Sequence, residues 1–178
     1  MSTQSLFQSA RLTYRAFTSS DIDALYEAWN DPSVQDGMSP GAIKPVAENI
    51  KEKFKAWPDS MALFLAAADT KSGCFVGMVG LAWEMPRDAK LMMLVKRDEW
   101  AKGYGTEMVQ WTVQHAFRFL DAHRVSLMVY ASNPRAISIY KKAGFVQEGI
   151  TRKVHFAHGR WIDAVCMGIL DEEFFNRG

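Results

Sequence analysis

The chain has 178 residues, of which 48% are hydrophobic and 23% are charged, and its formal net charge is +1. This length and composition predict one soluble globular domain spanning residues 1–178. A charge so near zero gives no drive toward nucleic acid or a membrane surface, so neither is expected as a partner.

Local composition excludes further classes of protein. The longest apolar run, Met61 to Ala68, is too short to span a bilayer. The first five residues lack the basic and apolar regions of a secretory signal, so a cytoplasmic location is expected. Cys74 and Cys166 lie in apolar stretches, which predicts core thiols rather than a disulfide or a zinc site. The four histidines show no metal-ligand spacing, so no metal is expected.

The N-terminal segment predicts a strand followed by a helix. Leu12 and Tyr14 alternate with polar neighbours, as in a half-buried strand. Thr18 and Asp21 have the spacing of a capping box, so a helix is expected to begin there. Asn30-Asp31-Pro32 is expected to end it.

The next segment predicts a loop and a second helix. Residues 33–44 contain glycines and a proline without a clear period, which indicates a loop. Pro45 suits the first position of a helix whose apolar side carries Val46, Ile50 and Phe54. Pro58 is expected to stop that helix.

Three strands joined by short turns follow. Residues 61–68, 74–83 and 90–96 are apolar and bounded by turn residues, which predicts an antiparallel meander. A helix is expected from about Thr106 to Leu120, and then a strand over residues 124–130. A strand, a crossover helix and a strand predict a parallel pair.

The turn between residues 96 and 106 contains Gly103 and Gly105 at a strand-to-helix junction. Glycine permits positive φ and a close approach of the backbone to a ligand. The first helical amides have no intrahelical partner and face an anion at the positive end of the helix dipole. Lys102 adds a positive charge. By itself the pattern fits both a tight turn and a diphosphate seat, and it is neither a Walker loop nor a full dinucleotide fingerprint.

A second motif follows the predicted strand. Asn133 is a good N-cap and Pro134 a good first residue for a helix that is expected to run to about Lys142. Gly144 is expected to close it in the left-handed conformation. A strand from residue 145 to 148 and a closing hairpin, residues 151–157 with 161–170, complete the expected elements.

These two motifs, Trp100-Ala101-Lys102-Gly103-Tyr104-Gly105-Thr106-Glu107 and Asn133 to Phe145 with Glu148-Gly149, resemble the GCN5-related N-acetyltransferase superfamily. The resemblance covers about residues 11–174 and is strongest to the branch with ribosomal-protein alanine acetyltransferases and spermidine acetyltransferases. It implies a single α/β (α+β) domain with a mixed sheet of about seven strands, an antiparallel N-terminal meander, a splayed parallel pair and about four flanking helices. Trp100 departs from the superfamily pattern, which has Gln or Arg there.

The resemblance implies acetyl-CoA as the co-substrate. Its pyrophosphate would sit on the amides of the glycine turn, and its pantetheine arm would pair with the preceding strand and bond the side chain of Asn133. The implied cofactor-binding residues are Leu94, Val95, Lys96, Lys102, Gly103, Tyr104, Gly105, Thr106, Asn133 and Tyr140. An amide near Leu94 or Val95 would polarise the thioester carbonyl.

Tyr140 occupies the position that often protonates the departing thiolate in this superfamily, although its helical spacing also suits a core residue. The attacking amine must lose a proton, and Glu84 is the candidate base, with Asp88 and Glu27 as further candidates. A solvated turn residue is an equally good interpretation of Glu84. Trp29 and Trp83 fit either an acceptor pocket or the core.

The resemblance therefore implies acetyl transfer to a primary amine by direct attack on the thioester, with a small-molecule acceptor preferred. A protein N-terminus as acceptor and a non-catalytic acyl-CoA-binding regulatory module are the alternatives. A polycationic acceptor would require clustered carboxylates, for which four acidic residues near the first helix are candidates: Asp21, Asp23, Glu27 and Asp31. A homodimer through the closing hairpin with Trp161 is a further possibility by analogy.

Overall fold

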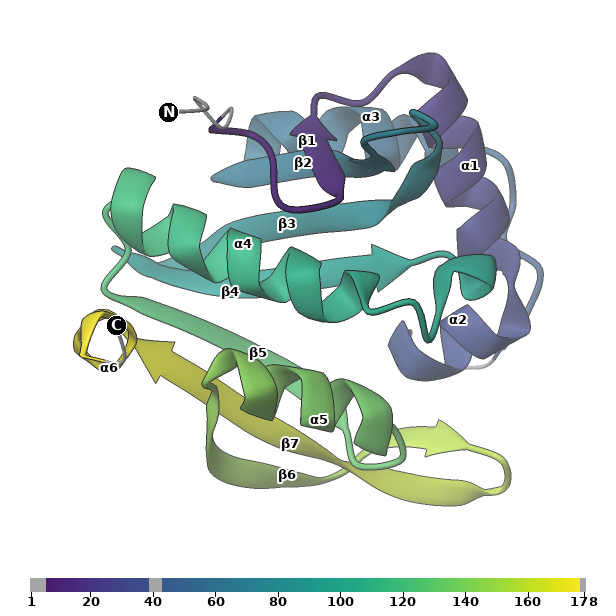
Figure 1. Ribbon diagram of the computed structural model, residues 1–178. Coiled ribbons are helices and arrows are strands. Elements are labelled where there is room, and N and C mark those ends of the chain that lie inside the picture. The colour runs from purple at the N-terminus through teal and green to yellow at the C-terminus, as the bar shows by residue number, and fades with distance from the viewer. Residues whose placement is uncertain (1–5, 39–42, 177–178) are drawn as a thin grey trace.

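The computed structural model describes residues 6–38 and 43–176 (Figure 1). Seven strands form one sheet in the order β1-β2-β3-β4-β5-β7-β6, and every neighbouring pair is antiparallel except β4–β5. The strands are β1 Leu12–Arg15, β2 Leu63–Asp69, β3 Phe75–Met85, β4 Asp88–Val95, β5 Arg124–Tyr130, β6 Val146–Ala157 and β7 Arg160–Leu170. The predicted class, strand number, N-terminal meander and parallel pair are confirmed.

Helices cover both faces of the sheet (Figure 1). In the described residues they are α1 Ser19–Asn30, α2 Pro32–Met38, α3 Ile50–Ser60, α4 Tyr104–Phe119, α5 Pro134–Ala143 and α6 Asp171–Phe175, with a 3-10 turn at Arg97–Glu99. The helices α4 and α5 lie on one face, and α1 and α3 lie on the other. Two more helices are present than the four expected, because α2 and α6 are short and leave a weak periodic signal. None of the described helices is long and apolar enough to cross a bilayer.

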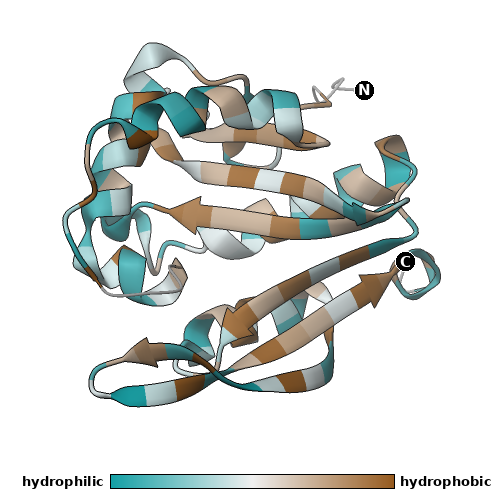
Figure 2. Cartoon of the chain, turned by 180° about the vertical axis from the view of Figure 1, so that it is seen from behind, coloured by the Kyte–Doolittle hydropathy of each residue, from teal (hydrophilic) through white to brown (hydrophobic). Residues whose placement is uncertain are grey.

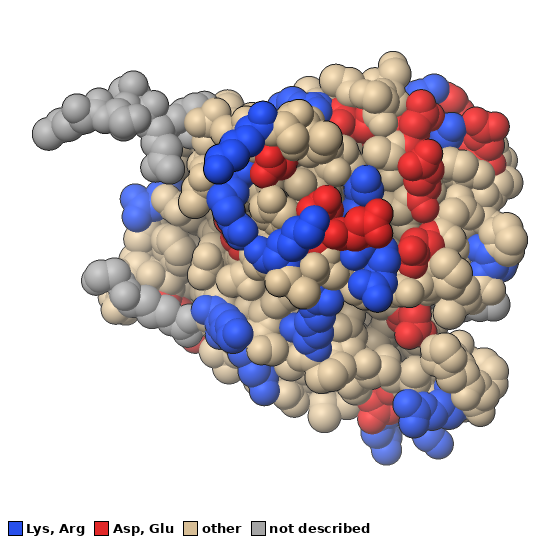
Figure 3. Space-filling model, turned by 45° about the vertical axis from the view of Figure 1, so that its right-hand side comes forward, with Lys and Arg blue, Asp and Glu red and all other residues tan. Residues whose placement is uncertain are grey.

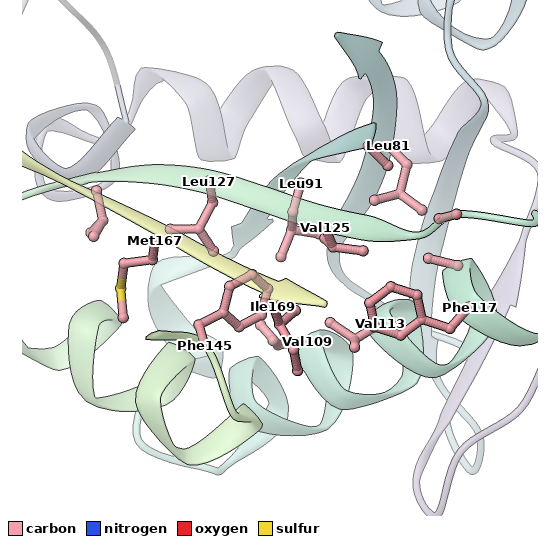
Figure 4. Close-up of a cluster of buried hydrophobic side chains, with 14 of the residues drawn as sticks. Leu81, Leu91, Val109, Val113, Phe117, Val125, Leu127, Phe145, Met167 and Ile169 are labelled. Carbon is pink, nitrogen blue, oxygen red and sulfur yellow. The ribbon is translucent and has the colours of Figure 1, made fainter. Parts of the chain in front are cut away.

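The largest core cluster lies between the sheet and α4 and α5 (Figure 4). Val109, Val113 and Phe117 recur at four-residue spacing on α4 and face alternate residues of the strands, such as Leu91 and Val125. A second cluster packs α1 and α3 on the opposite face, around Phe54, Leu25 and Met78. Burial of each such side chain stabilises the fold by roughly 1.5–3 kcal/mol. Figure 2 shows hydrophobic residues concentrated on the strands, whereas the helices carry both hydrophobic and hydrophilic residues.

The parallel pair is joined at one end only. Three residue pairs connect β4 and β5: Asp88 with Arg124, Ala89 with Val125, and Lys90 with Ser126. Beyond them β4 continues to pair with β3, and β5 continues to pair with β7. The strands therefore separate from Leu91 and Leu127 onward, which confirms the predicted splay.

The segment predicted as a loop contains a helix. The first part of residues 33–44 belongs to α2, because Pro32 begins it and the Oδ1 atom of Asp31 accepts from the backbone N of Ser33 at 2.7 Å and of Val34 at 3.3 Å. The aspartate that was expected only to end α1 thus also caps α2. Residues 39–42 lie outside the described residues.

The second helix begins and ends later than predicted. Residues 47–49 form i→i+3 turns, with the amide N of Ile50 donating to the O of Ala47 at 3.1 Å, so α3 begins at Ile50 rather than Pro45. Pro58 removes one backbone donor but does not end the helix, which continues to Ser60. The predicted strand at residues 145–148 and the first hairpin strand are one strand, β6, interrupted by two register shifts.

The prediction of two core thiols is wrong. Cys74 is exposed, because it lies in the turn between β2 and β3, where the strand has not yet entered the core. Cys166 is half-buried and lies beside Thr151, whose Oγ1 is 3.4 Å from its sulfur. An apolar sequence neighbourhood therefore did not locate either thiol.

The capping box at the start of α1 is confirmed and extended. Asp21 is buried, and its carboxylate accepts from the Thr18 backbone N at 2.7 Å, the Thr18 hydroxyl and the Arg15 guanidinium. Burial raises the pKa of this carboxyl, but the bonds from Arg15 and Thr18 outweigh burial and the pKa is lowered overall.

We expect Asp21→Asn to lower the free energy of unfolding at pH 7 by about 2 kcal/mol, because it weakens charged hydrogen bonds. A lowered folded pKa contributes stability above the unfolded pKa of about 3.9 that is lost as pH falls through the folded value. The difference from the parent should therefore shrink in acid. Urea denaturation at pH 7 and pH 3 measures it, with exposed Asp59→Asn as control. An equal difference at both pH values would contradict the assignment.

Candidate active site

A cavity of about 610 Å³ occupies the gap where β4 and β5 separate. Segments that are far apart in the sequence form its walls. Helices α1, α2 and α3 contribute one wall, and the turn before α4, the start of α4 and α5 contribute the other. Of the ten residues predicted to bind the cofactor, eight line it: Leu94, Val95, Gly103, Tyr104, Gly105, Thr106, Asn133 and Tyr140. Lys96 and Lys102 do not.

The turn before α4 has the geometry that its glycine predicted. Gly103 is the N-cap residue, with φ 86°, and Ala101 also has a positive φ of 64°. The helical ladder starts with the amide N of Glu107, which donates to the O of Gly103 at 3.3 Å. The amides of the residues between them have no partner inside the helix, and these residues line the cavity. The turn therefore presents backbone donors and the positive end of a 16-residue helix to the cavity.

A long-range brace that the sequence did not reveal holds this turn. The guanidinium of Arg11 donates from Nη1 to the O of Lys102 at 2.8 Å and pairs with Glu107 at 2.8 Å. It also lies 4.6 Å from the ring centroid of Tyr104, whose hydroxyl donates to Asp69 at 3.0 Å. The ammonium of Lys102 pairs with Glu99 at 2.9 Å, which raises the pKa of Lys102. The start of α4 is thus held by Arg11, which directly precedes β1, and by Asp69 of β2.

Register determines which backbone groups of β4 face the gap. The amide N of Lys96 donates to the O of Val76 at 2.9 Å, so this pair is a hydrogen-bonded pair of the antiparallel ladder. Such pairs alternate, and the N–H and C=O of Val95 therefore point away from β3, toward β5. Of the two amides predicted to polarise a carbonyl, the register favours that of Val95 over that of Leu94.

Trp100, the departure from the superfamily pattern, has its own contacts. Its indole Nε1 donates to the O of Val95 at 2.8 Å and ties the turn to the end of β4. The guanidinium carbons of Arg97 and Arg135 lie 4.6 Å and 5.1 Å from its ring centroid. Arg135 also lines the cavity. The sequence did not predict Arg135 as a cation near the anion seat, because only the fold brings α5 against the turn.

Helix α5 places its N-cap residue, Asn133, and Tyr140 of its second half in the cavity wall. The Oδ1 of Asn133 accepts from the backbone N of Ala136 at 3.0 Å, as an N-cap does. Its Nδ2 lies against Gly37 of α2, where an added Cβ would approach it to 3.1 Å. Tyr140 packs edge-on against Phe145, at 5.8 Å between ring centroids, and burial raises the pKa of its phenol to about 12.

The candidate bases lie outside this wall. Glu84 is exposed at the end of β3, and its carboxylate pairs with the ammonium of Lys90, which does line the cavity. Asp88 pairs with Arg124 at 3.3 Å at the joined end of the two strands. Glu27 is exposed on α1. Trp29 lines the cavity, whereas Trp83 is exposed and does not.

The sheet has a splayed parallel pair with a helix N-terminus at the gap, which is the arrangement that the resemblance to acetyltransferases implied. A sequence model of the family described as "Acetyltransferase (GNAT) domain" matches residues 11–146, and the chain belongs to this family.

Individual relatives agree with this membership. Spermidine N(1)-acetyltransferase of Vibrio cholerae is 30% identical over 91 residues, which span 51% of this chain and 53% of that protein. Uncharacterized N-acetyltransferase p20 of Bacillus licheniformis is 25% identical over 175 residues, which span 92% of this chain and 95% of that protein. The chain thus matches only about half the length of the Vibrio cholerae relative.

Among solved structures, the spermidine N-acetyltransferase from Vibrio cholerae in complex with CoA and spermine has a TM-score of 0.83 and 23% identity. The superposition covers 94% of this chain and 100% of that one. An acetyltransferase of the GNAT family from Bacillus anthracis has a TM-score of 0.81 at 21% identity. At these identities the likeness demonstrates the fold.

Proposed function

We propose that the protein is an acetyl-CoA-dependent N-acetyltransferase that acetylates a primary amine of a small molecule. The observation that carries the proposal is the gap between β4 and β5, which runs from unpaired strand edges to the amides at the start of α4. Acetyl-CoA fits this layout, because its diphosphate suits helix amides flanked by Arg135 and its amide-containing arm suits a strand edge.

The co-substrate would supply the acetyl group as an activated thioester. The chain would hold its diphosphate on the amides of Tyr104, Gly105 and Thr106, with Asn133 as a side-chain donor to the arm. The N–H of Val95 would point at the developing oxyanion, where one fixed donor is worth about 10²–10³ in rate. No covalent intermediate with the protein is required, since direct attack gains chiefly from proximity.

Proton transfer would involve Tyr140 and the apolar wall. With a pKa of about 12, the phenol of Tyr140 keeps its proton at physiological pH and can donate a hydrogen bond that stabilises a departing thiolate. An alkyl ammonium, with a pKa of about 10.4 in water, loses its proton more easily in an apolar cavity. Glu84 pairs with Lys90, which lines the cavity, and so lies next to the cavity rim. It stays the predicted acceptor of that proton.

Isothermal titration with acetyl-CoA, followed by a thiol-release assay against small amines and N-terminal peptides, tests the proposal. Micromolar binding with release by a small amine would support it. Release by peptides alone would favour a protein N-terminus as acceptor. Binding without release by any acceptor would favour the regulatory module, and absence of binding would reject the seat at α4.

We expect Gly103→Ala to weaken CoA binding about tenfold, because a Cβ at φ 86° costs about 1–2 kcal/mol and the turn must relax away from the seat. Titration calorimetry with CoA measures the effect. Gly159→Ala is the matched control, since Gly159 has φ 76° with nothing within 4 Å of the added Cβ and lies in the β6–β7 turn. Both variants should lose stability, but only Gly103→Ala should lose affinity; equal CoA affinities would contradict the seat.

A further inference from the structure

We infer that the amine acceptor has an apolar body rather than a polycationic one, an inference that rests on the proposed acetyltransferase function. We base this inference on the side chains that line the part of the cavity opposite α4. It is formed by the sheet face that α1, α2 and α3 cover, and its side chains are set by strand alternation.

Alternation separates the two faces of β4 and β5. Leu91 of β4 and Val125 and Leu127 of β5 pack in the core under α4 and α5. The intervening residues therefore point to the other face, and those lining the cavity include Met92, Met128 and Tyr130. Figure 1 places α2 beside the end where the two strands part. An acceptor entering from this end meets the second face of the sheet.

The lining of this region is apolar and rich in methionine. Four of the chain's ten methionines line the cavity on this side: Met38, Met78, Met92 and Met128. A fifth lining methionine, Met93, points to the face under α4. Trp29 of α1 and Trp57 of α3 stand beside the first four, with ring centroids 5.7 Å apart. Methionine is flexible and makes favourable contacts with aromatic rings, and tryptophan offers a large apolar surface. This lining suits a hydrocarbon or aromatic body.

The described residues of that lining offer little negative charge to neutralise a polycation. Among the described residues, the one carboxylate that lines the cavity is Glu99, which belongs to the 3-10 turn before α4 and pairs with Lys102 at 2.9 Å. Residues 39–42, next to Met38, are Ser, Pro, Gly and Ala in the sequence. Lys90 brings a positive charge to the same wall. A multiply charged amine would lose its hydration there without a partner, which is unfavourable.

Three of the four acidic residues that were candidates for a rim have other roles: Asp21 is buried with Arg15, Asp23 pairs with Lys51 at 2.8 Å, and Asp31 caps α2. The fourth, Glu27, is exposed on α1 and lies outside the cavity lining. Figure 3 shows acidic and basic side chains side by side on the face in view rather than a field of one sign. The Vibrio cholerae spermidine N-acetyltransferase structure contains spermine, a polycation. The cavity wall of this chain lacks, among its described residues, the cluster of carboxylates that would neutralise such a ligand.

The test measures kcat/KM with acetyl-CoA for 2-phenylethylamine, hexylamine, putrescine and spermidine, and calorimetric binding of each amine to the CoA-bound protein. We expect at least a tenfold preference for the two apolar amines in both measurements. A spermidine value equal to or above theirs would overturn the inference while leaving the acetyltransferase function intact. Absence of acetylation for every amine would instead reject the function, and the inference with it.

A charge-introducing variant gives a second, independent test. Met128→Glu places a carboxylate in the lining at a residue that is 48% exposed, so the fold should tolerate it. We expect tenfold weaker binding of 2-phenylethylamine and tighter binding of spermidine. Val146→Glu is the control, because Val146 is 47% exposed and lies outside the cavity lining. Unchanged selectivity in Met128→Glu, with the melting temperature retained, would overturn the inference.

Discussion

Replacing Tyr140 with phenylalanine is expected to lower kcat by about 10²-fold while the Kd for CoA changes by no more than about twofold. The phenol lines the cavity, and its raised pKa, about 12, keeps the proton in place until a thiolate develops beside it. A thiol has a pKa of only about 8.5, so the phenol is the weaker acid of the two. We therefore expect it to stabilise the thiolate by donating a hydrogen bond, without transferring its proton completely. Removing only the oxygen leaves the packing against Phe145 unchanged.

Tyr26→Phe is the matched control for this loss. Its hydroxyl donates to the O of Val46 at 3.0 Å, and Tyr26 does not line the cavity. This variant should lose a little stability and retain its turnover. Equal turnover in both variants, measured by thiol release at saturating acetyl-CoA, would show that Tyr140 has a packing role only.

Replacing Gly77 with alanine is expected to destabilise the fold by about 3 kcal/mol or more. An added Cβ would lie 2.1 Å from the O of Leu94 and 3.0 Å from the Cα of Val95, so the backbone of β4 must move. Gly77 is paired with Val95, at the edge of the proposed thioester site. The variant should therefore also lose acetyl-CoA affinity in whatever fraction remains folded.

The control for Gly77→Ala is Gly149→Ala in β6, another strand glycine, where nothing lies within 4 Å of the added Cβ. Urea denaturation of the two variants separates the steric effect from the general effect of substituting glycine in a strand. If the two variants were equally stable, the backbone of β4 would move away from the added Cβ with no loss of free energy. That result would contradict the close approach of Gly77 to Leu94 and Val95.

Local signals predicted the elements that depend on neighbouring residues. The capping box at Thr18, the strand at residues 124–130, the Asn133 cap and the left-handed Gly144 all appear where the sequence predicted them. Each is decided within one turn of helix or by alternation along one strand. The same is true of the glycine turn before α4, whose φ at Gly103 follows from the residue type.

The rest of the site depends on residues that are distant in the chain. Arg11 and Glu107 are 96 residues apart, and no local pattern connects them. Trp29 and Met128 come together only because α1 packs over the second face of the sheet. Glu84 lies where the β3–β4 register shifts between Trp83 and Met85, so alternation does not give the face to which it points. A dimer through Trp161, which is 59% exposed, stays a prediction.

Because only three residue pairs join β4 and β5, we expect the two halves of the sheet to behave as two coupled units in hydrogen exchange. The N-terminal unit contains β1 to β4, and the C-terminal unit contains β5 to β7, with α4 packed across both. A ligand that forms hydrogen bonds to the edges of both β4 and β5 stabilises the state in which the two units are folded and packed together. Acetyl-CoA should therefore slow amide hydrogen exchange throughout β7, although β7 itself contributes no residue to the cavity lining.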